Sequence, residues 1–173
     1  MVSKPFVSVI VTTNNRKELL KETIDSILNQ TFENFELIVI DNFSDYDFLA
    51  YVESFNDVRI NTFQNQNNGV IAVNRNYGMK KAKGEYIAFC DDDDFWEESK
   101  LEEQLKYFKD DNLIGVGTSL KLINSKSFII EEQKKDENRL LGLNEIVFES
   151  VPLSSLLIKN IGLLFDESTS FIA

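Results

Sequence analysis

Short apolar segments alternate with amphipathic segments through the first hundred residues of the chain, and this alternation limits the fold more than any other feature. Four segments have the β-branched and aromatic composition of strands: Phe6–Thr13, Phe35–Ile40, Val58–Phe63 and Glu85–Cys90. The segments between them are predicted to be helices: Arg16–Gln30, Asp45–Phe55 and Val70–Lys83. This order predicts an α/β fold, with a mostly parallel sheet and helices on both faces.

The helix ends and the second half of the chain carry weaker signals. Gly84 is expected to end the third helix in a left-handed conformation, and Ser99 with Glu102 has the spacing of a capping box for a fourth helix. Further strands are expected within Leu113–Ile123, Phe128–Ile130 and Leu153–Ile158, the first two as a hairpin-like extension. The charged segment Glu131–Arg139 is expected to be an exposed loop.

Polar residues follow three of the predicted strands at the points where those strands end. They are Thr12, Asp41 with Asn42, and the four consecutive aspartates Asp91–Asp94. Parallel strands place their carboxyl ends at one edge of a sheet, where ligands of such folds bind. We therefore expect these three groups to meet at one edge.

Four adjacent carboxylates at the end of an apolar strand repel one another unless a cation lies among them. The chain has no histidine and a single cysteine, Cys90, which excludes disulfides, thiolate or imidazole zinc sites and Ser-His or Cys-His catalytic pairs. Oxygen ligands remain, and these suit Mg²⁺ or Mn²⁺. A solvated acidic loop that caps the next helix is the alternative. The flanking strand and Phe95–Trp96 favour a metal and diphosphate site.

The net charge of −11 argues against a nucleic-acid partner or an anionic membrane surface, so an anionic ligand would need a metal or a local cation. Arg75 is a candidate for that cation. Trp96 is either a core residue or part of a substrate pocket, and Cys90 is expected in the core. No apolar run approaches the ~20 residues that span a bilayer, and no signal-peptide pattern begins the chain, so a cytoplasmic location is expected.

The order of the motifs resembles glycosyltransferase family 2 over nearly the whole chain. The segments that carry the resemblance are Val7–Arg16, Leu28–Phe32, Phe35–Asn42 and Lys83–Phe89 with the aspartate run after it. The resemblance implies the GT-A fold, a Rossmann-like nucleotide-binding sheet with an Asp-x-Asp-type metal motif. It also implies transfer of a sugar from a nucleotide donor with inversion at the anomeric carbon.

Site residues are carried over from the family by position. Thr12 and Asp41 resemble nucleoside-contacting residues, while Asn14 and Asn42 occupy positions where many members have a tyrosine and a second aspartate. An amide at Asn42 still accepts a hydrogen bond from a pyrimidine ring N–H. Arg75 resembles a donor-associated arginine. Within the motif, Asp91 and Asp92 are assigned to the donor, with Asp92 on the ribose, and Asp93 to the metal ion, Mn²⁺ or Mg²⁺.

The resemblance also implies that the chain has a donor-binding half and part of an acceptor side, and that the general base lies outside it. Residues 1–173 would form a single GT-A domain, with residues 1–110 as the donor-binding half and residues 111–173 as the start of the acceptor side. Gly162–Ser168 resembles the family segment that shortly precedes an acidic pair containing the general base. That pair is expected beyond Ala173, so the chain is expected to be truncated near the acceptor side and no catalytic base is assigned.

The predicted function is inverting transfer of a sugar from a UDP- or dTDP-sugar to a saccharide or lipid-linked acceptor, in surface polysaccharide synthesis. A location at the inner face of the membrane would suit such an acceptor. One alternative is a metal-dependent nucleotidyltransferase, although no basic or glycine-rich triphosphate cradle is present. The other alternative is a non-catalytic, flavodoxin-like domain that binds a nucleotide or a metal.

Overall fold

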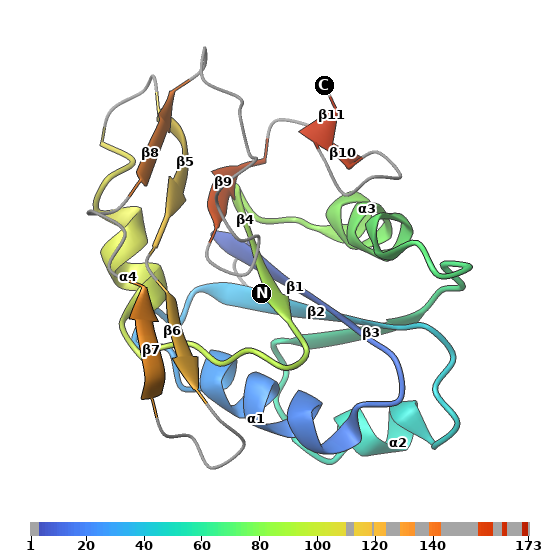
Figure 1. The fold of residues 1–173 in the computed structure, drawn as a ribbon. Helices are drawn as coiled ribbons and strands as arrows, with labels where there is room; N and C mark the ends of the chain where they lie inside the picture. The colour runs from blue at the N-terminus through green and yellow to red at the C-terminus, as the bar shows by residue number, and fades with distance from the viewer. Residues whose placement is uncertain are drawn as a thin grey trace.

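The computed structural model describes residues 4–109, 113–118, 120–123, 129–133, 139–142, 156–160, 164–165 and 171–172. A twisted β-sheet runs through the molecule, and helices pack against both of its faces (Figure 1). The helices α1 and α2 lie against one face of the sheet, and α3 lies against the other. The predicted arrangement of helices on both faces is therefore confirmed.

The strands are β1 (Val7–Thr13), β2 (Phe35–Asp41), β3 (Ile60–Gln64), β4 (Tyr86–Asp91), β5 (Leu113–Gly117), β6 (Leu120–Ile123), β7 (Ile129–Gln133), β8 (Arg139–Gly142), β9 (Leu157–Lys159), β10 (Leu164–Phe165) and β11 (Phe171–Ile172). The helices are α1 (Lys17–Leu28), α2 (Phe48–Glu53), α3 (Ile71–Lys81) and α4 (Lys100–Leu105). None of the helices in the described part of the chain is long and apolar enough to cross a membrane.

The main sheet has seven strands in the order β3-β2-β1-β4-β9-β5-β8. The first four of these are parallel, while β9 pairs antiparallel with both β4 and β5. Two further pairs, β6 with β7 and β10 with β11, are antiparallel. The order places β1 in the middle of the parallel part, between β2 and β4.

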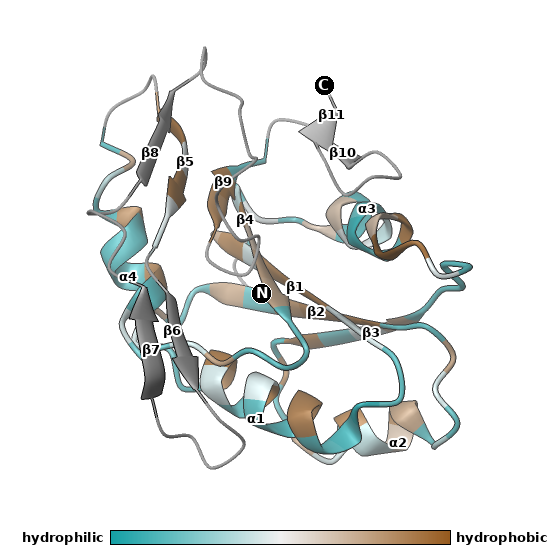
Figure 2. Cartoon of the chain, in the orientation of Figure 1, coloured by the Kyte–Doolittle hydropathy of each residue, from teal (hydrophilic) through white to brown (hydrophobic). Residues whose placement is uncertain are grey.

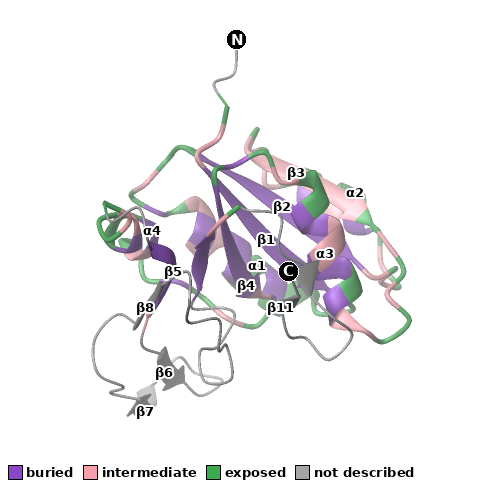
Figure 3. Cartoon of the chain, turned by 90° about the horizontal axis from the view of Figure 1, so that it is seen from above, coloured by how far each residue is buried: buried purple, intermediate pink, exposed green. Residues whose placement is uncertain are grey.

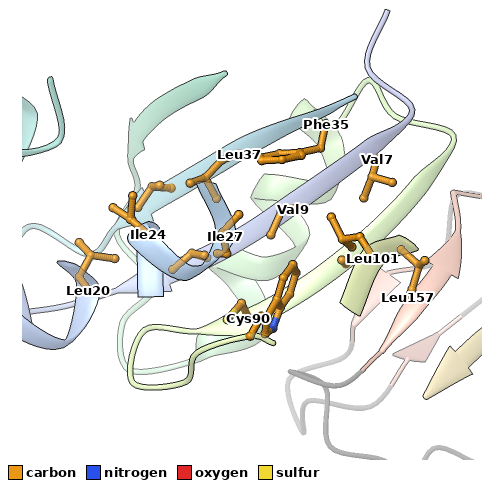
Figure 4. Packing of buried hydrophobic residues seen from close by; sticks show 14 of the residues in the cluster. Val7, Val9, Leu20, Ile24, Ile27, Phe35, Leu37, Cys90, Leu101 and Leu157 are labelled. Carbon is orange, nitrogen blue, oxygen red and sulfur yellow. The ribbon is translucent and has the colours of Figure 1, made fainter. Parts of the chain in front are cut away.

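Alternating residues of the central strands belong to two hydrophobic clusters, one on each face of the sheet. In β1, Val9 belongs to the cluster beneath α1, whereas Ile10 belongs to the cluster beneath α3. The apolar side of α1 places Leu20, Ile24 and Ile27 against the first face (Figure 4). Figure 2 shows the resulting pattern, in which the apolar strands lie inside and the outer faces of the helices are hydrophilic.

Because their neighbours cover both faces, the central strands β1, β2 and β4 are almost completely buried, whereas the edge strand β3 is partly exposed (Figure 3). Every residue of β1 and β2 is buried, in agreement with the near-continuous apolar runs that strands of parallel sheets show. Cys90 lies in this core, and burial raises the pKa of its thiol well above the ordinary value. The prediction of a buried, structural cysteine is confirmed.

Two predicted helix-end signals are wrong. The third helix ends at Lys81 with Ala82 in an extended conformation, and among described glycines only Gly69 has a positive φ. Gly84 is needed for space, because a Cβ atom there would lie 2.6 Å from the backbone nitrogen of Ser8. Ser99 makes no side-chain capping bond.

The structure also changes the expectations for the second half of the chain. The segment Glu131–Arg139 is not one exposed loop, since residues 131–133 belong to β7 and residue 139 begins β8. The remaining residues, 134–138, lie outside the described part. The expected hairpin-like extension is found only in part, because β6 pairs antiparallel with β7 whereas β5, the first half of the predicted Leu113–Ile123 strand, belongs to the main sheet. A strand near Leu153–Ile158 is found as β9.

Candidate donor-binding site at the sheet edge

The carboxyl ends of β1, β2 and β4 meet at one edge of the sheet, as the sequence predicted. In the register of the parallel pairs, Thr12 lies opposite Asp91 and Thr13 lies opposite Asp41. Thr12 itself is nearly buried, at 9% exposure. The three polar groups singled out from the sequence are therefore adjacent in the fold.

Asp41 is completely buried and is held by uncharged donors. Its carboxylate accepts hydrogen bonds from the backbone nitrogen of Ser44 at 3.0 Å and from the Ser44 hydroxyl. The side-chain nitrogen of Gln64 donates a third bond at 3.0 Å. A direct contact between Asp41 and a nucleoside, as the resemblance implied, would need one of these donors to move.

The loops after β1 and β2 are tied together by asparagine side chains. Asn15 has a φ of 55°, a left-handed conformation that asparagine tolerates better than most residues. Its backbone nitrogen donates to the Ser44 hydroxyl at 2.8 Å, and its side-chain oxygen accepts from the backbone nitrogen of Asp45 at 2.8 Å. Asn14 donates its side-chain N–H to the carbonyl oxygen of Asn42 at 2.9 Å. The two loops therefore form one rigid unit.

The loop that contains Asn67 also holds Asn42 in place. Its side-chain oxygen accepts a hydrogen bond from the backbone nitrogen of Asn67 at 2.9 Å, and its own backbone nitrogen donates to the carbonyl of Thr13 at 2.9 Å. An amide oxygen has two lone pairs, so this oxygen can still accept one bond from a ligand. The amide is thus oriented before any ligand arrives.

Asp91, the first residue of the aspartate run, forms an ion pair with an arginine. Asp91, the last residue of β4, accepts a hydrogen bond from Arg75 at 2.7 Å. The Arg75 side chain is only 8% exposed and projects from α3, so the sheet edge contains a buried cation. Arg75 and Asp91, both predicted as donor-binding residues, are brought together by the fold.

Asp92 is buried but connected to both a hydroxyl and a guanidinium group. One carboxylate oxygen accepts from the Thr13 hydroxyl at 2.7 Å, and the other accepts from Arg16 at 3.0 Å. Burial raises the pKa of Asp92 above the ordinary value, and the bonds from Thr13 and Arg16 oppose that rise. The residue is a positioned carboxylate rather than a solvated surface group.

Asp93 is the exposed member of the run, with 46% of its side chain accessible. One of its oxygens accepts a hydrogen bond from the same Arg16 nitrogen at 2.7 Å. The charges of Asp92 and then Asp93 raise the pKa of the Arg16 guanidinium. One arginine therefore bridges the two carboxylates that the resemblance assigns to the ribose and the metal.

The backbone of the run turns sharply and is fastened to α1. The amide of Asp94 donates to the carbonyl of Asp91 at 3.1 Å, and the carbonyl of Asp94 accepts from the Thr23 hydroxyl at 2.7 Å. The next residues enter the core: Trp96 is 5% exposed and the Lys100 ammonium lies 4.3 Å from the centre of its ring. Trp96 is therefore a core residue, and its alternative role in a pocket is not supported.

The donor atoms fit a divalent metal that is shared with a ligand. In the described residues, no three or more Asp, Glu, Cys or His side chains are grouped to hold an ion. Mg²⁺, however, is commonly bound by one or two carboxylates together with substrate phosphates. Asp93, exposed and at the end of a strand, is the residue that would hold such an ion.

A second opening lies away from this edge. It has a volume of about 450 Å³ and is lined by Leu28, Asn29, Gln30, Glu33 and Arg59. Glu33 lies two residues before β2 and Arg59 lies one residue before β3, so the opening is at the amino ends of these strands. Arg59 is already engaged by Asp57 and by the carbonyl of Leu28, and no predicted site residue reaches this opening.

Sequence reasoning assigned no role to several residues that build the edge. They are Thr13, Asn15, Arg16, Ser44 and Gln64. Most of these residues follow a strand in the sequence and are polar, which is the only signal that marks them. Apart from the local bond between Ser44 and Asp41, their pairs join residues from different strands or loops, so these partners depend on strand order and register.

Sequence comparison identifies related proteins. The sequence profile of "Glycosyl transferase family 2" matches residues 8–161. The chain is 34% identical over 138 residues to the UDP-Glc:alpha-D-GlcNAc-diphosphoundecaprenol beta-1,3-glucosyltransferase WfgD of Escherichia coli, covering 78% of the chain and 54% of that protein. It is 37% identical over 107 residues to the putative teichuronic acid biosynthesis glycosyltransferase TuaG of Bacillus subtilis, covering 60% and 42%.

Solved structures show the same architecture. TarS of S. aureus in complex with UDP superposes with a TM-score of 0.77 at 23% identity, over 94% of the chain and 51% of TarS 1-349. A mannosyltransferase of Pyrobaculum calidifontis, in complex with GDP-Man and Mn²⁺, gives a TM-score of 0.58 at 26% identity, over 69% and 36%. The fold is the GT-A fold.

The GT-A fold and the sequence match together place the chain among the glycosyltransferases. The chain belongs to glycosyltransferase family 2. It spans about half or less of the length of the relatives described above, and only 18% of an uncharacterized glycosyltransferase of Rickettsia bellii that is 41% identical over 126 residues.

Proposed function

We propose that this chain binds the nucleotide-sugar donor of an inverting glycosyltransferase whose donor is a UDP- or dTDP-sugar. The observation that carries the proposal is the pair Asp92 and Asp93 at the end of β4, one buried and positioned, the other exposed. Two neighbouring strands end beside them in polar residues. Family membership favours this function over a nucleotidyltransferase or a flavodoxin-like binding domain.

The proposed roles follow from where each residue lies. Asp93 would hold Mn²⁺ or Mg²⁺, which when bound supplies Lewis-acid stabilisation of the departing nucleoside diphosphate. Arg75, buried beside Asp91, would add positive charge at the diphosphate. Asp92 would accept a hydrogen bond from the ribose. A solved mannosyltransferase of similar fold is in complex with GDP-Man and Mn²⁺, which supports the use of a divalent metal.

The remaining predicted residues would form the nucleoside end of the site. Thr12 near the end of β1, and Asn14 and Asn42 on the loops after β1 and β2, offer short polar groups. Asp41 would hold that loop in shape and would touch the base only if Gln64 or Ser44 released it. Small polar groups suit the narrow edge of a pyrimidine, which is why a uracil or thymine nucleotide is proposed.

The acceptor and the setting come from the relatives. WfgD acts on a diphosphoundecaprenol-linked sugar, and TuaG is assigned to teichuronic acid synthesis, according to their names. We propose a saccharide acceptor, free or lipid-linked, in surface polysaccharide synthesis, which would bring the protein to the inner face of the membrane. Residues 1–110 would serve the donor and residues 111–173 the start of the acceptor side.

A nucleotide panel tests the donor. Melting temperature is measured with UDP, dTDP, GDP and ADP, each with Mn²⁺ and each with a chelator. A ligand that binds only the folded state raises the midpoint, and the rise grows with the logarithm of the ligand concentration divided by its dissociation constant. We expect UDP or dTDP with Mn²⁺ to give the largest rise. A larger rise with GDP would favour a purine donor like that of the mannosyltransferase, and no rise with any nucleotide would contradict the proposal.

A further inference from the structure

Arg16 occupies the place where a cation at Asp93 would be expected. A single guanidinium nitrogen, Nη1, donates to Asp93 at 2.7 Å and to Asp92 at 3.0 Å. Two carboxylates so close together need a positive partner. In the structure Arg16 supplies that partner.

A metal ion at Asp93 would be opposed by this arrangement. The guanidinium already neutralises the Asp93 carboxylate, and a second cation beside it would be repelled. A divalent cation therefore binds at Asp93 either after Arg16 has moved away or with an affinity lowered by repulsion from its guanidinium. Arg16 should weaken the affinity of the protein for a free metal ion.

Arg16 is placed so that it can move. Its side chain is 49% exposed, whereas the Arg75 side chain is 8% exposed and fixed at Asp91. Within the described residues, the Nε and Nη2 atoms of Arg16 make no hydrogen bond, so most of its donors are unused. An arginine fork with free donors matches the geometry of a phosphate group.

We propose that Arg16 is an exchangeable counter-ion of the donor site. Without donor it pairs with Asp93 and keeps metal affinity low, and when a metal and a nucleoside diphosphate arrive together it leaves Asp93 for the diphosphate. Metal and nucleotide then bind cooperatively, because the nucleotide supplies a new partner for the guanidinium that the metal displaces. This inference rests on the proposed donor-binding function.

Calorimetric titrations of Arg16→Gln and the unaltered protein test the exchange. Mn²⁺ is titrated alone, and UDP is titrated in saturating Mn²⁺. Since partly exposed charge pairs contribute up to about 1 kcal/mol, we expect Arg16→Gln to bind Mn²⁺ alone about 3- to 5-fold tighter and UDP with Mn²⁺ several-fold more weakly. Lys21→Gln is the matched control, because it removes one positive charge from α1, the helix that follows Arg16, and breaks an exposed pair with Asp25.

The opposite signs of the two effects distinguish exchange from a structural role. Weaker binding of both ligands, or unchanged Mn²⁺ affinity, would overturn the proposal. Adding Asp93→Asn to Arg16→Gln should abolish the gain in Mn²⁺ affinity, which shows that the gain arises at Asp93. Arg16→Lys keeps the charge and should bind Mn²⁺ as weakly as the unaltered protein. Failure of the unaltered protein to bind UDP in any condition would count against the proposed function, while the Mn²⁺ titrations still decide whether Arg16 competes at Asp93.

Discussion

The sheet edge contains two carboxylate centres that differ in how their charge is compensated. At the end of β2, Asp41 is wholly buried and, within the described part of the chain, its carboxylate receives hydrogen bonds only from the neutral groups of Ser44 and Gln64. At the end of β4, Asp91, Asp92 and Asp93 are paired with arginines, and Asp93 is 46% exposed. The same residue type thus serves two different ends of one candidate site.

The difference separates a structural role from a binding role. Neutral donors around a buried carboxylate fix a loop, and removing the carboxylate leaves those donors without acceptors. An exposed ion pair contributes little to stability, and a ligand can replace it. We therefore assign loop geometry to the Asp41 centre and exchange with ligands to the Asp93 centre.

The largest expected effect is a loss of stability in Asp41→Ala. The change leaves the Ser44 amide, the Ser44 hydroxyl and the Gln64 amide without their acceptor, which should lower the free energy of unfolding by about 3 kcal/mol. Urea denaturation measures it. Asp45→Ala is the control, since Asp45 is exposed in the same loop and should change stability by less than about 0.5 kcal/mol. Equal small losses in both variants would refute the structural role of Asp41.

The reverse pattern is expected for Asp93→Ala. Unfolding free energy should change by less than about 1 kcal/mol, because the lost ion pair is half exposed. UDP affinity in Mn²⁺ should fall about tenfold or more, to the value measured with a chelator. Asp25→Ala is a matched control, because its carboxylate is 44% exposed and also ion-paired, yet lies on α1 away from the strand ends. A large loss of stability in Asp93→Ala would show that Asp93 has a structural role and would contradict its assignment as a ligand-binding residue.

A smaller effect is expected at Thr13, which connects the two centres. Its backbone oxygen accepts from the amide of Asn42, while its hydroxyl donates to Asp92. Thr13→Val keeps the shape and the backbone but removes the hydroxyl, so it should cost about 1 kcal/mol of stability. Thr13→Ser should restore most of it in the same denaturation experiment. No difference between the valine and serine variants would mean that the bond to Asp92 is not needed.

The smallest effect is a change in the pH dependence of stability through Asp92. Its pKa in the folded state is raised by burial, so the folded protein holds this proton more tightly than the unfolded chain does. The contribution of Asp92 is fully present below the unfolded pKa of about 3.9 and is lost as the pH rises through the folded pKa. Asp92→Asn, measured in chelator, should therefore gain stability relative to the unaltered protein between pH 3 and pH 7. A relative loss over that range would show that the arginine pair outweighs burial.

Much of the fold was predictable because local patterns and the sheet agree. The apolar runs of β1 and β2 and the periodicity of α1 gave the correct elements, and their alternation gave the parallel sheet. The helix ends were less predictable. Gly84 was assigned to a left-handed cap, but its lack of a side chain serves a close approach to Ser8 on another strand. Sequence spacing alone does not report such contacts.

The candidate site was predictable in composition but not in its pairings. The location of Thr12, Asp41 and the aspartates at strand ends followed from the alternation, and the register confirms that they are adjacent. The pairing of Arg16 with Asp92 joins residues 76 positions apart, and that of Gln64 with Asp41 joins residues 23 positions apart. These pairings depend on which strands are neighbours, and no local pattern specifies them.

The central claim is that the exposed end of this edge binds a nucleoside diphosphate together with a divalent cation. Titration of UDP into the unaltered protein, first in Mn²⁺ and then in excess chelator, tests it most directly. The account predicts measurable binding in Mn²⁺ and a loss of at least about tenfold in affinity in chelator, because a protein of net charge −11 repels a free diphosphate. Equal affinity in the two conditions would contradict the account.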